Sequence, residues 1–198
     1  MTQITVESRG SVVLARLSRG VTNALDLACV EELAEVIQQV RGAPDVRALV
    51  VASSNDKFFS MCCDYRFIAE GRKLMGLNEV KLGVPVPYVA DRVLHALVGA
   101  RQARRVMEGG EFYGPEESLE MGMVDQVWPL ERVVEEAVEK AEALGSLPGT
   151  AYGMIKRNRV EAVEAEIAAW REEKEGAFIE CWYSDEARER LREAMDKF

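Results

Sequence analysis

The alternation of apolar and polar residues at the start of the chain predicts a β-hairpin followed by a helix. Two β-like runs cover residues 4–7 and 12–17, with a glycine between them, as in strands joined by a tight turn. Apolar residues then recur at helical spacing over 27–37, and a glycine and a proline follow this stripe. Two further apolar runs, at 46–52 and 63–69, predict two more strands.

The connection between these last two strands is short. Only residues 53–62 join them, and this stretch shows no helical pattern. Parallel neighbours in one sheet need a crossover of about a dozen residues or more, usually one that contains a helix. The two strands are therefore antiparallel, or they are not neighbours, or a segment is missing between them.

The rest of the chain alternates between loops, helices and short strands. Glycine and proline residues punctuate a loop over 78–87. The later predicted elements are helices at 88–98, 101–108 and 115–122, a strand at 123–127 and a helix at 131–144. A break at 145–149 precedes an entirely helical tail, in which Ser184 is placed to cap the last helix. We therefore expect an α/β core over 1–145 and a C-terminal helical region over 146–198.

Composition and charge restrict the function classes. The chain has 198 residues, of which 48% are hydrophobic and 30% charged, as in ordinary globular proteins. Acidic residues number 34 against 25 lysines and arginines, and the net charge of −9 argues against general nucleic-acid binding. Anionic ligands would need a local basic patch. One small basic cluster, Arg101, Arg104 and Arg105, is expected to form a helix face paired with glutamates.

The scarcity of histidine limits the available chemistry further. His95 is the single histidine, which excludes a multi-histidine metal site, and no metal centre is expected. It lies beside an apolar stripe and is interpreted as a helix-flank residue. The cysteines, interpreted as reduced thiols, are Cys29, Cys62, Cys63 and Cys181. An enzyme built from this chain would therefore rely on carboxylates and backbone amides.

Membrane insertion and export are not indicated by the sequence. No apolar stretch reaches the roughly 20 residues of a membrane span. The first residues have neither the basic nor the apolar region of a signal peptide. We expect a soluble, cytoplasmic protein that has no membrane or nucleic-acid partner.

Five spaced segments occur in the order typical of one known family. They are Asn23–Asp26, Phe58–Ser60, Cys63–Arg66, Leu77–Gly83 and Gly122–Val127. Together with the last helices of the tail, they resemble the enoyl-CoA hydratase/isomerase (crotonase) superfamily, and within it the Δ3,Δ2-enoyl-CoA isomerases. The resemblance implies an α/β crotonase-like spiral of ββα units, with a C-terminal helical oligomerisation region that assembles homotrimers or hexamers.

The resemblance also implies a function and a set of site residues. It implies an enzyme of fatty acid metabolism that shifts a double bond from C3 to C2 of an enoyl-CoA. Glu79 matches the catalytic acid/base, and the backbone N–H of Met61 matches one oxyanion-hole donor. Coenzyme A enters as part of the acyl-CoA substrate, near Ala24, Lys57 and Lys197, and no cofactor is bound permanently.

Other interpretations stay open from the sequence. From the residues alone, the ordinary interpretation of Glu79 is a solvated loop carboxylate, and that of Lys57 and Lys197 is surface solvation. The alternative functions are a 2-enoyl-CoA hydratase, which needs a second carboxylate to position water, and a non-catalytic, oligomerising crotonase-like protein.

One segment departs from the family pattern. Phe59-Ser60-Met61 runs directly into Cys62-Cys63-Asp64, where family members have a longer stretch. That stretch holds a Gly-Gly donor of the oxyanion hole and the second glutamate of the hydratases. Because the departure coincides with the short connection 53–62, we expect a segment to be missing near 61–63, and enzymatic activity depends on that segment.

Overall fold

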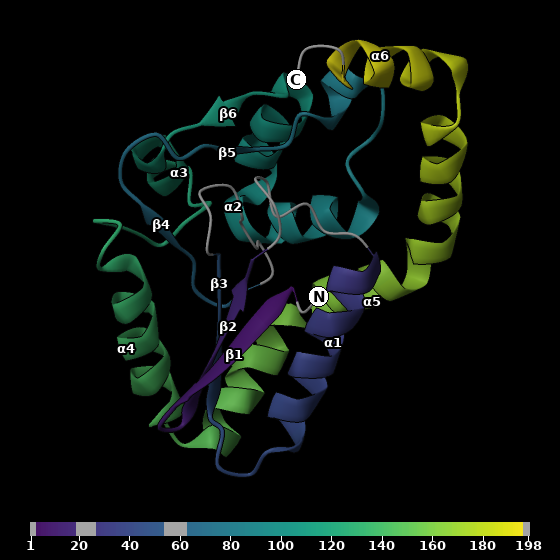
Figure 1. Ribbon diagram of the computed structural model, residues 1–198. Helices are drawn as coiled ribbons and strands as arrows, with labels where there is room; N and C mark the ends of the chain where they lie inside the picture. The colour runs from purple at the N-terminus through teal and green to yellow at the C-terminus, as the bar shows by residue number, and fades with distance from the viewer. Residues whose placement is uncertain (1–2, 19–26, 54–62, 196–198) are drawn as a thin grey trace. The chain divides into compact units, whose positions relative to one another are not determined.

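The computed structural model describes residues 3–18, 27–53 and 63–195 (Figure 1). The chain divides into two compact units. The first unit comprises Met1–Ser60, Phe67–Lys73 and Gln126–Met154, and the second comprises Met61–Arg66, Leu74–Asp125 and Ile155–Phe198. Each unit therefore combines segments that are far apart in the sequence.

A three-stranded sheet forms the centre of the first unit. Strands β1 (Ile4–Arg9) and β2 (Val12–Leu17) pair antiparallel, and Gly10 in the turn has a φ of 58°. Strand β3 (Ala48–Ser53) pairs with β2 in parallel, so β2 is the central strand. The predicted hairpin is thereby confirmed.

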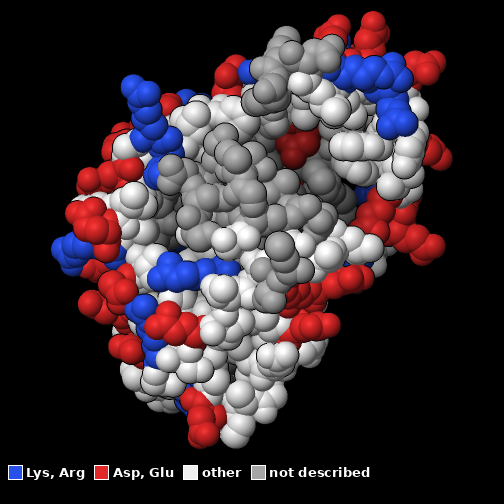
Figure 2. Space-filling model, viewed as in Figure 1, with Lys and Arg blue, Asp and Glu red and all other residues white. Residues whose placement is uncertain are grey.

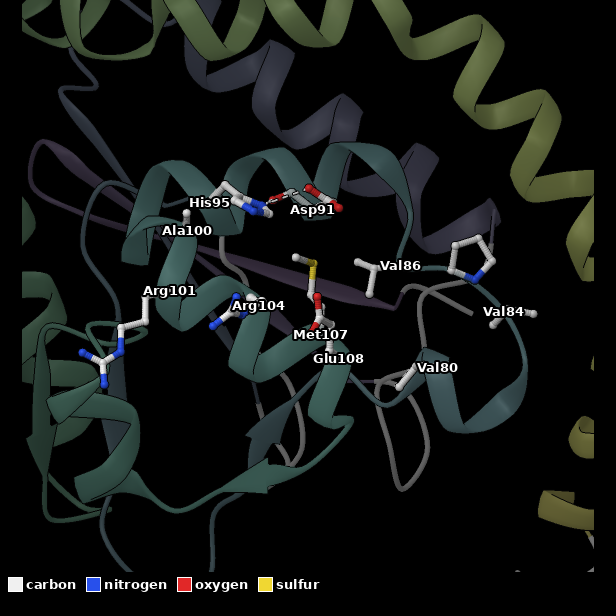
Figure 3. Close-up of a pocket in the computed structure, with 11 residues that line it drawn as sticks. Val80, Val84, Val86, Asp91, His95, Ala100, Arg101, Arg104, Met107 and Glu108 are labelled. Atoms are coloured by element: carbon white, nitrogen blue, oxygen red, sulfur yellow. Dashed lines mark hydrogen bonds and ion pairs between the residues drawn. The ribbon is translucent and has the colours of Figure 1, made fainter.

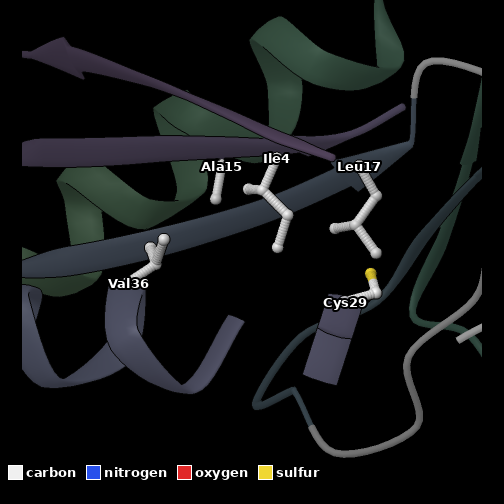
Figure 4. Packing of buried hydrophobic residues seen from close by; sticks show 5 residues of the cluster. All are labelled: Ile4, Ala15, Leu17, Cys29 and Val36. Carbon is white, nitrogen blue, oxygen red and sulfur yellow. The ribbon is translucent and has the colours of Figure 1, made fainter. Parts of the chain in front are cut away.

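Helices cover both faces of this sheet. Helix α1 (Leu27–Gly42) contributes Cys29 and Val36 to a buried cluster with Ile4, Ala15 and Leu17 (Figure 4). Helix α4 (Val133–Gly145) contributes Val138 and Ala141 to a second cluster, whose strand residues are Val12, Leu14 and Val50. Successive strand side chains point to opposite faces, so β2 supplies one apolar set to each helix. This arrangement explains why β2 is apolar at nearly every position.

The short connection after β3 has a simple topological explanation. Strand β4 (Phe67–Ala69) pairs in parallel with β7 (Gln126–Trp128), in a sheet separate from that of β3. Strands β3 and β4 are therefore not neighbours, which was one of the three alternatives. The proposed site of a missing segment, near 61–63, includes residues 61 and 62, which lie outside the described residues.

The strands predicted over 63–69 and 123–127 both start later in the structure, at Phe67 and Gln126. The prediction of a strand over 63–69 was wrong for residues 63–66, because the side chain of Arg66 turns inward there. Its Nε donates to the carbonyl oxygen of Met123 at 3.0 Å, and its guanidinium pairs with Asp125 at 2.8 Å. Asp125 also accepts from the Arg66 amide, so both segments are held by this pair before their strands begin.

The second unit carries the loop predicted to be functional. A 3₁₀ helix, η1 (Glu79–Leu82), lies inside this loop. Helix α2 (Tyr88–Gly109) follows and is interrupted at Gly99, whose φ of 73° and ψ of 163° separate the two predicted helices. Strand β5 (Met75–Gly76) pairs with β6 (Phe112–Tyr113), and α3 (Pro115–Glu120) completes this region.

Two helices end the chain. Helix α5 (Gly149–Trp182) buries no residue, and apolar side chains such as Trp170 (49% exposed) and Ile179 (53% exposed) lie on its surface. Helix α6 (Asp185–Met195) begins as predicted after Ser184, whose Oγ accepts a hydrogen bond from the Ala187 amide at 3.3 Å. Among the described residues, no helix combines the length and apolarity of a membrane span.

Candidate active site

Glu79 is the first residue of the tight turn formed by η1. The carbonyl of Asn78 accepts a hydrogen bond from the Lys81 amide at 2.9 Å, and that of Glu79 accepts from Val84 at 3.1 Å. Gly83 ends the turn in the left-handed conformation, with a φ of 74°. Glycine occupies this conformation without the strain that a side chain would cause. The local sequence thus fixes the backbone that carries Glu79.

Distant parts of the second unit hold this turn from outside. A Cβ on Gly83 would lie 3.3 Å from the Cα of Ala187, which shows how closely α6 approaches. The Sγ of Cys181 donates to the Gly83 carbonyl at 3.4 Å. At the end of α2, a Cβ on Gly110 would lie 2.9 Å from Cγ1 of Val80. The turn is therefore packed between α6 and the end of α2.

The carboxylate of Glu79 is an unusual acid in this turn. The residue is half-buried, and its Oε2 is buried without a hydrogen-bond partner among the described residues. Burial raises the pKa of Glu79 above its ordinary value of 4.5, although its own backbone amide acts in the opposite direction. Buried polar atoms are almost always paired, so an orphan carboxylate oxygen marks a candidate functional group. Glu79 is therefore less solvated than the ordinary interpretation of a loop carboxylate expects.

The other predicted site residues cannot be placed beside it. Ala24, Lys57, Met61 and Lys197 all lie outside the described residues. Their roles in the oxyanion hole and in coenzyme A binding stay predictions.

The remaining polar candidates of the sequence have local partners. His95 lies on α2, where its Nδ1 is 3.0 Å from Oδ1 of Asp91, one helical turn earlier. The predicted helix-flank position of His95 is thus confirmed. The described residues contain no group of three or more potential metal ligands.

Charge is dispersed over the surface. On the face shown in Figure 2, small groups of lysine and arginine lie among acidic side chains, which outnumber basic ones in the sequence by 34 to 25. A nucleic-acid-binding face carries a continuous basic stripe, and the described residues on the face in Figure 2 form none.

Sequence reasoning missed the contacts that hold the Glu79 turn. Gly83 touches α6 and Gly110 touches Val80 across large sequence separations, and no local pattern encodes either contact. The one available signal was the Gly109-Gly110 pair at the end of α2, which is typical of a helix end but does not indicate what packs there.

Comparison with solved structures defines the class of fold. The structure matches human mitochondrial delta3-delta2-enoyl-CoA isomerase with a TM-score of 0.92, over 99% of this chain and 98% of that chain, at 21% sequence identity. It matches carnitinyl-CoA hydratase from Mycobacterium avium with a TM-score of 0.88, over 98% and 96% of the two chains, at 20% identity. The chain is a crotonase-fold protein, as the sequence predicted.

Sequence comparison then gives the family. The family model described as enoyl-CoA hydratase/isomerase matches residues 58–198. Human enoyl-CoA delta isomerase 1, mitochondrial, is 28% identical over 139 residues, which cover 70% of this chain and 46% of that protein. Crotonyl-CoA hydratase of Syntrophomonas wolfei is 25% identical over 138 residues, or 70% and 53%. The chain belongs to the enoyl-CoA hydratase/isomerase family and spans about half the length of these two relatives.

Proposed function

We propose that this protein is an acyl-CoA isomerase that moves a double bond from C3 to C2 of an enoyl-CoA. The observation that carries the proposal is the half-buried carboxylate of Glu79, with an orphan oxygen and a raised pKa. Family membership and the similarity to isomerases support the same reaction class. The hydratase relative shows that the family also includes water addition, so the experiment must separate the two reactions.

The reaction needs one base that becomes an acid. Glu79 takes a proton from C2 of the 3-enoyl thioester, and the electron pair of the broken C–H bond delocalises into a dienolate. The protonated Glu79 then returns a proton to C4, so the product has the same composition as the substrate. A raised pKa suits this cycle because the carboxyl group must hold the proton between the two steps.

The dienolate oxygen requires hydrogen-bond donors. Two donors aimed at the thioester oxygen stabilise the charge that develops there. We assign one of them to the backbone N–H of Met61. We assign coenzyme A binding to Ala24, Lys57 and Lys197, with coenzyme A entering as part of the substrate rather than as a resident cofactor.

The C-terminal helices are assigned to self-association into homotrimers or hexamers. The exposed apolar residues of α5, including Ile155 (68% exposed) and Trp170, support this assignment. Side chains of this kind are usually buried when a partner is present. Sedimentation equilibrium gives the molecular mass in solution, and a monomer at micromolar concentration would contradict the assignment.

The decisive experiment is turnover of 3-hexenoyl-CoA by the wild-type protein and by Glu79→Gln. The matched control is Glu120→Gln, which removes an exposed carboxylate on α3. We expect Glu79→Gln to lose at least a hundredfold in kcat and Glu120→Gln to match the wild type, because general acid–base catalysis typically contributes about 10²–10⁴-fold. Equal rates for all three proteins would overturn the assignment of Glu79.

A second substrate separates the alternative functions. Water addition to crotonyl-CoA, without isomerisation of 3-hexenoyl-CoA, would identify a hydratase. Calorimetry that detects no acyl-CoA binding by an intact oligomer would identify a non-catalytic protein.

A further inference from the structure

A cavity lies within the second unit, on the side of η1 that Val80 faces. It has a volume of about 750 Å³, within the range of about 300–1,000 Å³ typical of small-molecule pockets. Its apolar lining comes from the η1 segment and from the second half of α2, and includes Val80, Val84, Val86, Ala100 and Met107. Figure 3 shows the Met107 side chain between the two halves of α2, with Val86 and Val80 on the side of the loop.

Three exposed charged side chains at this cavity have no partner among the described residues. Arg101, Arg104 and Glu108 all line it. None of these three side chains forms a hydrogen bond or an ion pair with any described residue. By contrast, Arg105 on the same helix pairs with Glu117 at 3.3 Å and lies over the Tyr113 ring. The prediction that this basic cluster is paired with glutamates was therefore wrong for Arg101 and Arg104, the two arginines at the cavity.

The charges at the cavity leave a surplus of one positive charge. Arg101 and Arg104 contribute two positive charges and Glu108 one negative charge. Asp91, on the opposite wall, is already paired with Arg92 and His95. Guanidinium groups match the planar carboxylate group and bind it in bidentate geometry. A ligand with one negative charge and an apolar body complements this wall and this charge.

We propose that the cavity binds a fatty monocarboxylate, with its carboxylate at Arg101 and Arg104 and its apolar chain along Val84, Val86 and Met107. A second hollow on α2 shares Arg101, Arg104 and Glu108 with this cavity, so both guanidinium groups can be reached from outside. In this proposal, the ligand carboxylate is the ion-pair partner of Arg101 and Arg104.

The proposed fatty-acid cavity borders η1, the segment that carries Glu79. Val80 lines the cavity and follows Glu79 directly, whereas Glu79 itself is not part of the lining. A bound chain therefore contacts η1 without occupying the position of Glu79. Any effect of the ligand on turnover rests on the proposed function, but its binding does not.

Isothermal titration with decanoate, below its micelle-forming concentration, tests the proposal. We expect saturable binding by the wild-type protein, and a Kd at least tenfold higher for the double variant Arg101→Gln/Arg104→Gln. Arg72→Gln removes an exposed arginine outside the cavity and should keep the wild-type Kd. Ala100→Trp, which fills the cavity while keeping both arginines, should also abolish binding. Thermal unfolding of each variant verifies that it is folded.

Other outcomes would overturn the proposal. These are an absence of saturable binding by the wild type, equal affinity for the double variant, or binding of decanol as tight as that of decanoate. Glu79→Gln should bind decanoate with the wild-type Kd. This result keeps the cavity separate from the proposed function, because it holds even if Glu79 has no catalytic role.

Discussion

Replacing Glu79 with glutamine should make the protein more stable. The carboxylate is half-buried, and its Oε2 has no hydrogen-bond partner among the described residues. Glutamine keeps the shape of the side chain and removes the charge, so the desolvation of an ion is replaced by that of a neutral amide. A residue in a catalytic role is often retained at the expense of stability, and Glu79 fits this pattern.

The size of the effect follows from burial. An unsatisfied buried polar group costs about 1–3 kcal/mol, and more when charged. Because Glu79 keeps some solvent contact and the amide is also unpaired, the lower end applies, a gain of about 1 kcal/mol in the free energy of unfolding. For a chain of this size, that gain corresponds to a rise in Tm of about 2–4 °C.

The gain should depend on pH in a defined direction. Since burial raises the pKa of Glu79 in the folded state, the folded protein binds this proton more tightly than the unfolded chain. The wild type therefore loses stability, relative to Glu79→Gln, as the pH rises through the raised pKa. The difference should be full at pH 7 and should vanish below the ordinary value of 4.5.

Urea unfolding followed by circular dichroism, at pH 7 and at pH 4, measures both quantities. Glu120→Gln, at an exposed position, is the control and should change the free energy of unfolding little at either pH. A Glu79→Gln protein that is no more stable than the wild type at pH 7 would refute the reasoning. So would a gain of equal size at both pH values.

Three further predictions concern the surroundings of the site. The acid limb of the kcat/KM profile for 3-hexenoyl-CoA should have its midpoint above 4.5, since the first step needs ionised Glu79 and burial raises its pKa; a midpoint at or below 4.5 contradicts this. Arg66→Ala should lower the free energy of unfolding by about 1–3 kcal/mol in urea titrations, because the carbonyls of Met123 and Cys63 then lose the buried side chain that donates to them. Gly83→Ala should cost about 1–2 kcal/mol and reduce turnover, because an alanine at a φ of 74° is strained and crowds α6; an unchanged Tm would argue against this packing.

The order of the main elements could be predicted from the sequence because it depends on local patterns. The hairpin, the break at Gly99 and the cap at Ser184 each follow from residues close to them in the chain. Elements held by distant contacts could not be predicted in the same way. The β5–β6 pair is two residues long on each strand, and η1 is four residues long, too short for periodicity to show.

In the candidate site, too, features that depend on nearby residues could be predicted and those that depend on distant contacts could not. Glu79 was singled out by resemblance to a family, whereas its orphan oxygen depends on packing that no spacing rule describes. For the basic cluster, the sequence predicted the helix correctly but the pairing with glutamates incorrectly. Helical spacing placed Arg101, Arg104 and Arg105 correctly on one helix, but which of them meets a glutamate depends on the position of α3.

The packing of α6 against Gly83 also determines when, during translation, the Glu79 turn can gain this contact. Ala187 lies 104 residues after Gly83 in the chain, and Cys181 lies 98 residues after it. At about 5–20 residues per second, a ribosome needs roughly 5–20 seconds to make this stretch. The turn that carries Glu79 therefore lacks this outer support until residues 181–187 have been made. A chain truncated before Cys181 would carry Glu79 on a turn without the contacts of Cys181 and α6.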